Sequence, residues 1–356
     1  MIDLENIRQR AKQKLSATTY DYYAGGADDE LTLADNLAAW RRIRLVPRVM
    51  RDVSGITTEI EILGCTSSTP IMVGPWAFQA LAHEEGEPET ARGAAAAGAC
   101  MVASMMATSS LEVIAEAAAG SPLWFQFYVL RDRELTARLL RRAEAAGYRA
   151  LVMTVDKLPV PGRRRRRAAD RFSLPEGTRI PNLSYEVPPD RETGPDEYLG
   201  GLLDASVTFA DISWACEACD LPVFVKGVLS PDDALDAIEC GAAGIIVSNH
   251  GGRQLDGAVA TADALAPVID AVGGKIPILV DGGIRTGADA VKALAIGASA
   301  VLVARPVVWG LVVDGALGVE AVLRELTDEA AHTMALCGAA RVTDLDQKLV
   351  AGLAQF

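Results

Sequence analysis

Residues 237–249 read AIECGAAGIIVSN, and the fold can be inferred from the pattern in this stretch. An alanine-containing helical segment ends at a glycine, and a short run of Ile and Val follows after a spacer. The same order recurs in AAAAGACMVAS at 94–104, AEAAGYRALVMTVD at 143–156 and LAIGASAVLVAR at 294–305. The glycine stands where the end of a helix needs a left-handed residue, and the apolar run is typical of a buried strand. Each stretch is therefore the helix-to-strand half of a βα unit.

Eight apolar runs of strand length can be read along the chain by extending this pattern. They lie at 70–75, 99–104, 122–127, 150–156, 222–227, 244–249, 276–282 and 300–305. Continuous apolar runs, rather than alternating ones, indicate parallel strands that are covered on both faces. Eight such strands alternating with helices predict an α/β protein with a single (β/α)8 TIM barrel. An open doubly wound sheet is the alternative, but no GxGxxG motif opens a helix after a first strand to support it.

The remaining segments predict how the single domain, residues 1–356, is completed. Residues 1–65 precede the first strand, and we expect an N-terminal cap of short helices and a hairpin, TTEIEILG, that closes the bottom of the barrel. The barrel then takes up 66–356. Residues 157–205 interrupt the pattern after the fourth strand and are polar, which predicts a long mobile loop. A loop of this kind on the catalytic face is more often a lid than a linker.

Composition excludes several classes of function. A net charge of -13 and a pI near 4.8 disfavour nucleic acid as a partner. The polar N-terminal segment does not resemble a signal peptide, and no window approaches about 18 uninterrupted apolar residues, so we expect a cytoplasmic protein with no membrane partner. The 6 cysteines are scattered, and several lie in apolar runs, which favours structural free thiols over disulfides. No metal site is expected.

Polar side chains follow the predicted strands where functional residues of a (β/α)8 barrel lie. The most informative segment is SNHGGRQLD at 248–256. Its two glycines permit a close approach of the backbone to a ligand, and they place a proton acceptor, His250, near a fixed cation, Arg253. A structural histidine is the alternative interpretation, but the position at the end of a strand favours a general base.

The last two predicted strands carry a second signal. VDGGIRTGAD at 280–289 and VLVARP at 301–306 supply glycines and backbone N–H groups where barrels commonly bind phosphate. Arg285 and Arg305 can add charge-assisted hydrogen bonds. Together these segments predict a phosphorylated ligand.

Several motifs together resemble one known family. They are YDYYAGGADDE from position 20, HEEGE at 83–87, FQFYV at 125–129, TVD at 154–156, VKG at 225–227, SNHGGRQLD and DGGIRTG. In these motifs the chain is similar to the FMN-dependent α-hydroxy acid oxidases and dehydrogenases, a family that acts on glycolate, lactate or mandelate. The resemblance implies FMN as cofactor, oxidation of an (S)-2-hydroxy acid to the 2-keto acid, and a homo-oligomer, a tetramer or an octamer.

The resemblance also implies roles for individual residues. His250 would remove the substrate proton, Asp156 would stabilise the imidazolium, and Lys226 would lie by N1 and O2 of the flavin. The implied catalytic residues are His250, Asp156, Lys226 and Tyr128. The implied substrate-binding residues are Tyr23, Met106, Tyr128, Arg164 and Arg253, with Arg163 or Arg165 as alternatives to Arg164. The implied cofactor-binding residues are Ala77, Ser104, Gln126, Thr154, Lys226, Ser248, Asp281, Gly283, Arg285 and Arg305.

Three positions depart from the family pattern and bear on the substrate. Trp76 stands before Ala77 where the family usually has a threonine, Met106 stands where glycolate-type enzymes have a tryptophan gate, and Ala304 replaces a glycine. The unbranched Met106, with Phe78 and Tyr128 as aromatic walls, predicts a pocket for a bulky or aromatic side chain, as in mandelate. Trp76 is the residue that would refill this space.

Two other functions remain as alternatives. Another FMN barrel enzyme, such as a type 2 isopentenyl diphosphate isomerase, would use the flavin without net oxidation and would not need the carboxylate site. A non-catalytic flavin-binding protein would not need His250, Asp156, Lys226 and Arg253 together. Because the loop after the fourth strand lacks the apolar stretch of membrane-bound dehydrogenases, we expect O2, rather than another acceptor, to reoxidise the flavin.

Overall fold

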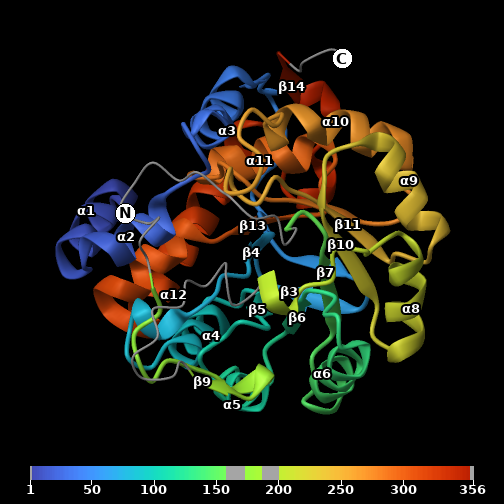
Figure 1. Ribbon diagram of the computed structural model, residues 1–356. Coiled ribbons are helices and arrows are strands. Elements are labelled where there is room, and N and C mark those ends of the chain that lie inside the picture. Colours follow the sequence, from blue (N-terminus) through green and yellow to red (C-terminus); the bar gives the residue numbers. More distant parts are fainter. Residues whose placement is uncertain (1, 158–172, 187–199, 353–356) are drawn as a thin grey trace.

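The computed structural model describes residues 2–157, 173–186 and 200–352 (Figure 1). Eight parallel strands form a closed barrel, and the first of them, β4, pairs with the last, β13. The strands are β4 (Ile71–Val73), β5 (Met101–Ser104), β6 (Leu123–Phe127), β7 (Ala150–Thr154), β10 (Val223–Val228), β11 (Gly244–Val247), β12 (Ile278–Val280) and β13 (Ala300–Val303). Each lies within its predicted range, except that β10 runs one residue further. The closure confirms the (β/α)8 barrel and overturns the open-sheet alternative, because a doubly wound sheet would leave two edges.

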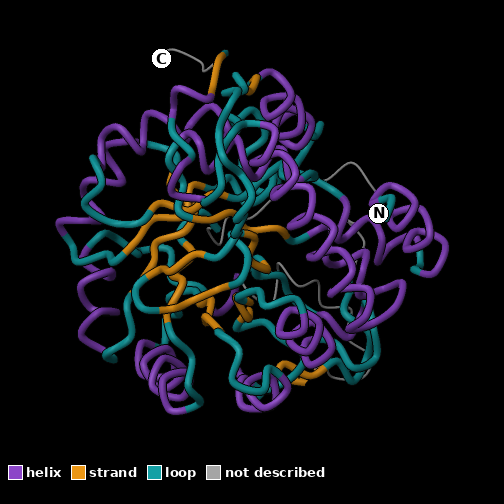
Figure 2. Tube along the Cα trace, turned by 180° about the vertical axis from the view of Figure 1, so that it is seen from behind, coloured by secondary structure: helices purple, strands orange, loops and turns teal. Residues whose placement is uncertain are grey.

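A helix follows each barrel strand and covers the outside of the barrel, as the purple helices around the orange strands show (Figure 2). The helices are α4 (Glu87–Ala96), α5 (Leu111–Ala117), α6 (Arg133–Ala145), α8 (Ala210–Ala218), α9 (Pro231–Glu239), α10 (Thr261–Val272), α11 (Gly287–Ile296) and α12 (Arg305–Leu336). Helix α12 is kinked at Asp314 and Gly315. It is long and apolar enough to cross a membrane, but 72% of its most apolar window is buried within the protein, as expected for a core helix.

The interior of the barrel is filled by side chains from alternate positions of the strands. Because successive residues of a strand point to opposite faces, one set of residues faces inward and forms its own apolar cluster. This set includes Met72, Val102, Trp124, Val152, Phe224, Ile246, Leu279 and Leu302. The rings of Trp124 and Phe224 lie 4.5 Å apart at its centre. The barrel is therefore a packed core and not a channel.

The N-terminal segment contacts the barrel at both ends, whereas the expectation placed it at the bottom alone. The hairpin of β2 (Ile60–Ile62) and β3 (Cys65–Ser67) closes the bottom, since Ile60 and Ile62 pack into the interior cluster. The helices are α1 (Leu4–Lys14), α2 (Ala17–Ala24) and α3 (Leu31–Arg42). Helix α1 packs on α12, and α3 lies against the opposite end, the mouth, where Asn36 donates to Asn249 at 2.9 Å.

The close fit of α3 to the mouth has a local cause. A side chain at Gly252 would place its Cβ 2.6 Å from the backbone nitrogen of Leu33, so only glycine permits this contact. The glycine pair after His250 therefore serves a protein contact as well as any ligand. Trp40 of α3 adds a hydrogen bond from Nε1 to the carbonyl of Gly282, 2.8 Å long.

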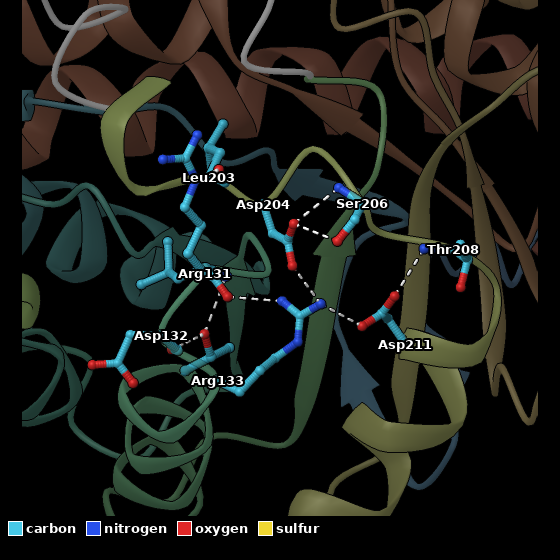
Figure 3. Close-up of polar contacts among 10 residues, drawn as sticks. Arg131, Asp132, Arg133, Leu203, Asp204, Ser206, Thr208 and Asp211 are labelled. Atoms are coloured by element: carbon cyan, nitrogen blue, oxygen red, sulfur yellow. Dashed lines mark hydrogen bonds and ion pairs between the residues drawn. The ribbon is translucent and has the colours of Figure 1, made fainter.

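Short elements complete the described chain. They are the pair β1 (Arg44–Leu45) and β14 (Val350–Ala351), the pair β8 (Arg179–Ile180) and β9 (Tyr185–Glu186), and the 3-10 helices η1 (Gln79–Leu81), η3 (Pro181–Leu183), η4 (Val342–Asp344) and η5 (Gln347–Leu349). The predicted loop over 157–205 lies partly outside the described residues. Arg133 anchors its far end, with ion pairs of 2.8 Å to Asp204 and 2.7 Å to Asp211 (Figure 3).

Candidate active site

The inward-facing positions change character towards the mouth of the barrel. Two residues beyond Val102, Trp124 and Val152, the same strand faces carry Ser104, Gln126 and Thr154. Lys226, Ser248 and Asp281 likewise follow Phe224, Ile246 and Leu279 by two positions. Because side chains alternate along a strand, six of the eight strands thus pass from the apolar core to a polar layer within two residues. All of these side chains except that of Ser248 border a cavity at the C-terminal ends of the strands, where barrel enzymes have their active sites.

The cavity contains most of the predicted site residues. It encloses about 1220 Å³ of empty space, counting the part open to solvent. The predicted residues that line it are Tyr23, Ala77, Ser104, Met106, Gln126, Tyr128, Thr154, Lys226, His250, Arg253, Asp281, Gly283, Arg285 and Arg305. Asp156 and Ser248 lie behind the lining, bonded to His250 and Lys226. Arg164 and its neighbours at 163 and 165 lie outside the described residues.

His250 and Asp156 form the central pair of the site. Nδ1 of His250 lies 2.8 Å from Oδ1 of Asp156, so the carboxylate holds the ring in one orientation. Burial lowers the pKa of His250 below its usual value, although Asp156 opposes this shift. Burial would raise the pKa of Asp156, but the charge and hydrogen bond of His250 and the charge of Lys226 outweigh it and lower that pKa. Near neutral pH this pair is a neutral imidazole beside a carboxylate.

Lys226 is a buried cation with two partners. Its Nζ lies 3.0 Å from Oδ2 of Asp281 and 2.8 Å from Oγ of Ser248. Burial lowers the pKa of this amine, but Asp281 and Asp156 outweigh it and raise that pKa, so Lys226 is charged. The cavity floor therefore carries a fixed positive charge.

Several buried polar atoms around the floor have no partner among the described residues. They are Nε2 of Gln126, Oγ1 of Thr154 and Oδ1 of Asp281. Ser104 donates to Oε1 of Gln126 at 3.0 Å, which turns the amide nitrogen towards other acceptors. A buried unsatisfied group costs about 1–3 kcal/mol, so these atoms indicate a ligand with several hydrogen-bonding atoms. The donors, acceptors and cation fit the polar edge of a flavin ring.

Three arginines meet at the side of the cavity formed by β12 and β13. Arg305 donates to the carbonyls of Tyr23, Gly251 and Gly25 at 2.9–3.1 Å. Burial holds the pKa of Arg305 well below its usual value, and the charges of Arg253 and Arg285 lower it further. Burial also lowers the pKa of Arg285, to about 10. An anion would relieve this concentration of positive charge, which fits the phosphate of FMN.

Of the three tyrosines of α2, Tyr22 and Tyr23 are placed differently from the prediction. Tyr23 lines the cavity, but its hydroxyl donates to the carbonyl of Phe78 at 2.7 Å and therefore holds a loop. Tyr22, which the prediction omitted, also lines the cavity and lies under the guanidinium of Arg253, 5.2 Å from the ring centre. The geometry favours Tyr22 over Tyr23 as the substrate-side tyrosine. The prediction of Phe78 as an aromatic wall is wrong, because Phe78 is fully buried and is not among the described lining residues.

Other residues of the cavity were not expected from the sequence. They include Lys157, Gln254, Ile284 and Val308. Lys157 could have been predicted from the sequence, because it directly follows Asp156 at the end of a predicted strand. Ile284 and Val308 carry no such signal, because apolar residues in a loop and in a helix usually indicate packing.

The comparisons with known proteins agree with this geometry. The chain matches the family of FMN-dependent dehydrogenases over residues 11–352. It is 47% identical to an L-lactate oxidase of Nostoc sp., covering 97% of this chain and 96% of that one. It is 45% identical to the glycolate oxidase of Spinacia oleracea, covering 96% and 93%.

Solved structures are similar over the same length. A mandelate oxidase with (S)-4-hydroxymandelic acid superimposes with a TM-score of 0.90, at 39% identity and covering 99% of this chain and 98% of that one. These matches favour hydroxy acid oxidation over the isomerase and the non-catalytic alternative. The chain therefore belongs to the FMN-dependent dehydrogenase family, and it is an FMN-dependent oxidoreductase that acts on the CH–OH group of a 2-hydroxy acid.

Proposed function

We propose that this enzyme oxidises a 2-hydroxy acid with a bulky or aromatic side chain, with His250 as the general base and O2 as the final electron acceptor. The observation that carries the proposal is the hydrogen bond of 2.8 Å between His250 and Asp156 at the wall of the cavity. It joins the most basic neutral side chain of the site to a carboxylate that stabilises it once protonated.

His250 has one ring nitrogen left for the substrate. Because Nδ1 bonds to Asp156, Nε2 is the nitrogen that accepts the proton. The lowered pKa of His250, caused by burial, keeps the ring neutral and ready to accept it. Asp156 then holds the imidazolium by charge and hydrogen bond. FMN, when bound, accepts the two electrons of the oxidation.

The carboxylate of the substrate requires cations at the open side of the cavity. Nη1 of Arg253 donates to the carbonyls of Tyr22 and Gly25 at 2.7 and 3.1 Å, which fixes the guanidinium in place. A guanidinium held in this way binds a carboxylate with little loss of side-chain entropy. Tyr22 and Tyr128 supply hydroxyls at the same cavity. A second arginine from 163–165, outside the described residues, is the further cation that we propose.

Residues at the other end of the cavity hold the cofactor in this proposal. Lys226 supports negative charge on the flavin ring, Gln126 and Thr154 satisfy its polar edge, and Arg305 and Arg285 bind the phosphate. The unpartnered atoms of Gln126 and Thr154 support this assignment. Ala77, Ser104, Asp281 and Gly283 complete the cofactor wall.

The size of the substrate follows from the residues that border the entrance. Met106 lines the cavity and is unbranched, so it adapts to different side chains. The solved relatives include a mandelate oxidase with (S)-2-phenylpropionate, 40% identical to this chain. Trp76 also lines the cavity and competes for the same space. The names of the relatives as oxidases support O2 as acceptor.

Anaerobic mixing with a panel of 2-hydroxy acids tests the proposal. The panel contains glycolate, lactate, 2-hydroxyoctanoate and both enantiomers of mandelate, and the bleaching of the flavin is followed before air is admitted. We expect (S)-mandelate to exceed glycolate in kcat/KM by about 10²-fold, since one methylene in a fitting pocket contributes about 1–3 kcal/mol. If glycolate is the best substrate, the assignment of a bulky or aromatic side chain is wrong. If no acid bleaches the flavin, the proposed oxidation is wrong. If the flavin stays bleached in air, O2 is not the electron acceptor.

A further inference from the structure

The HEEGE motif at 83–87 has no role in the proposed function, yet it ends in a fully buried carboxylate. Glu87 is 0% exposed and begins α4, directly behind the cavity wall. Burial raises the pKa of Glu87, while hydrogen bonds from Thr108 and Gln79 oppose the shift. A buried charge is costly unless it is well hydrogen-bonded, so the contacts of Glu87 reveal what it holds.

Glu87 joins two loops that are distant in sequence. Its Oε1 accepts hydrogen bonds from the backbone nitrogens of Gln79 at 3.1 Å and Thr108 at 2.9 Å. Its Oε2 accepts from the hydroxyl of Thr108 at 2.7 Å. That hydroxyl also accepts from the backbone nitrogen of Ala80 at 3.1 Å. One carboxylate and one hydroxyl thus connect the loop after β4, residues 74–82, with the loop after β5, residues 105–110.

The two loops and Gly86 fit closely together. A side chain at Gly86 would place its Cβ 3.0 Å from the backbone nitrogen of Ala80 and 3.2 Å from Oγ1 of Thr108. Phe78 adopts a left-handed backbone with φ of 60°, a conformation that persists only where surrounding contacts impose it. Its backbone nitrogen donates to the carbonyl of Met106 at 3.1 Å, which is a second link between the loops.

Both loops contribute the residues that determine the size of the substrate pocket. The first loop carries Trp76, and the second carries Met106. Both line the cavity, and neither contacts Glu87 through a hydrogen bond in the described structure. A change in the connection at Glu87 therefore reaches Trp76 and Met106 by moving one loop relative to the other.

We propose that Glu87, together with Thr108, is a positioning pair that sets the width of the substrate pocket by holding the loop of Trp76 against the loop of Met106. The inference rests on the proposed function, because it assigns these loops to the substrate side of the cavity. It predicts that weakening the pair changes the choice between small and bulky substrates, and leaves the chemistry at His250 and the binding of FMN intact.

Thr108→Val is the sharpest test, with Thr69→Val as its matched control. Both substitutions remove a hydroxyl that accepts from a backbone nitrogen, but Thr69 lies at the opposite end of β4, where it bonds to Ile71 and Thr327. We expect Thr108→Val to change the ratio of kcat/KM for (S)-mandelate and lactate by about 5-fold or more, mainly through KM. Thr69→Val should leave this ratio unchanged. Glu87→Gln, which retains one acceptor oxygen, should have an intermediate effect.

A binding measurement separates this inference from the proposed function. The dissociation constants of pyruvate and benzoylformate, read from the flavin absorbance, need no turnover and should shift relative to each other only in Thr108→Val and Glu87→Gln. Thr108→Val and Glu87→Gln could instead lose stability as Thr69→Val does, with no change in the ratio of kcat/KM values or in the ratio of dissociation constants. That result would overturn the positioning role and leave Glu87 with a structural role alone. If the wild type oxidises no 2-hydroxy acid but the binding ratio shifts, the proposed function fails and the positioning role stands.

Discussion

The two ends of the barrel interior use the same strands in opposite ways. At the bottom, Ile60 and Ile62 of the hairpin complete an apolar cluster in which Trp124 and Phe224 pack together. At the mouth, two residues further along six of the eight strands, the side chains are polar, and several of their atoms have no partner among the described residues. The bottom therefore stabilises the fold, while the mouth retains binding capacity. Along a strand, the two roles are only two residues apart.

The largest effect is expected at the mouth. His250→Gln should lower the rate of substrate-driven flavin reduction by about 10²–10⁴-fold, because the general base is lost. Bound FMN should remain, since His250 is not part of the arginine cluster. Stopped-flow absorbance measures the rate, and His332→Gln on the surface of α12 is the control. A His250→Gln variant that reduces its flavin at the normal rate would refute the base.

Phe224→Ala tests the opposite end. Removing a fully buried ring from the interior cluster should lower the free energy of unfolding by about 3–5 kcal/mol. Because Phe224 does not line the cavity, kcat per bound FMN should change little at temperatures where the variant is folded. Urea unfolding and flavin-normalised kinetics measure the two quantities. Loss of kcat without loss of stability would mean that the two ends are not separable.

Arg305→Lys should weaken FMN binding by about 10-fold or more. The guanidinium of Arg305 is fixed by the carbonyls of Tyr23, Gly25 and Gly251, and a flexible ammonium cannot reproduce that geometry. Fluorescence quenching of FMN on titration with apoprotein gives the dissociation constant, with the exposed Arg324→Lys as control. Equal affinity for FMN in the wild type and the variant would show that Arg305 does not bind the phosphate.

The smallest expected effect is a shift in the pH dependence of kcat/KM on substitution of Asp156. The base must be neutral, and because the pKa of His250 is lowered by burial, kcat/KM should begin to fall only below the ordinary value of about 6.5. The charge of Asp156 raises that pKa, so Asp156→Asn should move the acidic limb to lower pH while reducing the maximum. A limb that moves to higher pH in Asp156→Asn would contradict the charge interaction.

The barrel was predictable because each strand lies in a continuous apolar run, and four of these runs follow a helix that ends at a glycine. The mouth was predictable in outline for a related reason. The C-terminal ends of all barrel strands lie at the same end of the barrel, so polar residues there, such as Lys226 and His250, come together. The position of α3 was not predictable, since the contact of Gly252 with Leu33 is tertiary and leaves no local pattern.

The misassignment of Tyr23 has a different physical cause. Adjacent residues of a helix point in directions about 100° apart, so YDYY does not state which ring faces the barrel. Only the packing of α2 places Tyr22 under Arg253 and turns the hydroxyl of Tyr23 to Phe78. Phe78 was misread for a similar reason, since its left-handed backbone directs the ring into the core.

The pairing of β4 with β13 also determines when the molecule can be completed during synthesis. Until residues 300–303 have left the ribosome, β4 can pair with a neighbouring strand on one side only. The partner of β1, β14, is synthesised later still. Contacts between such distant segments form slowly, and unpaired apolar strand edges promote aggregation. The nascent chain therefore presents two open edges for most of its synthesis, and they disappear only with the closure that leaves the finished barrel without an edge.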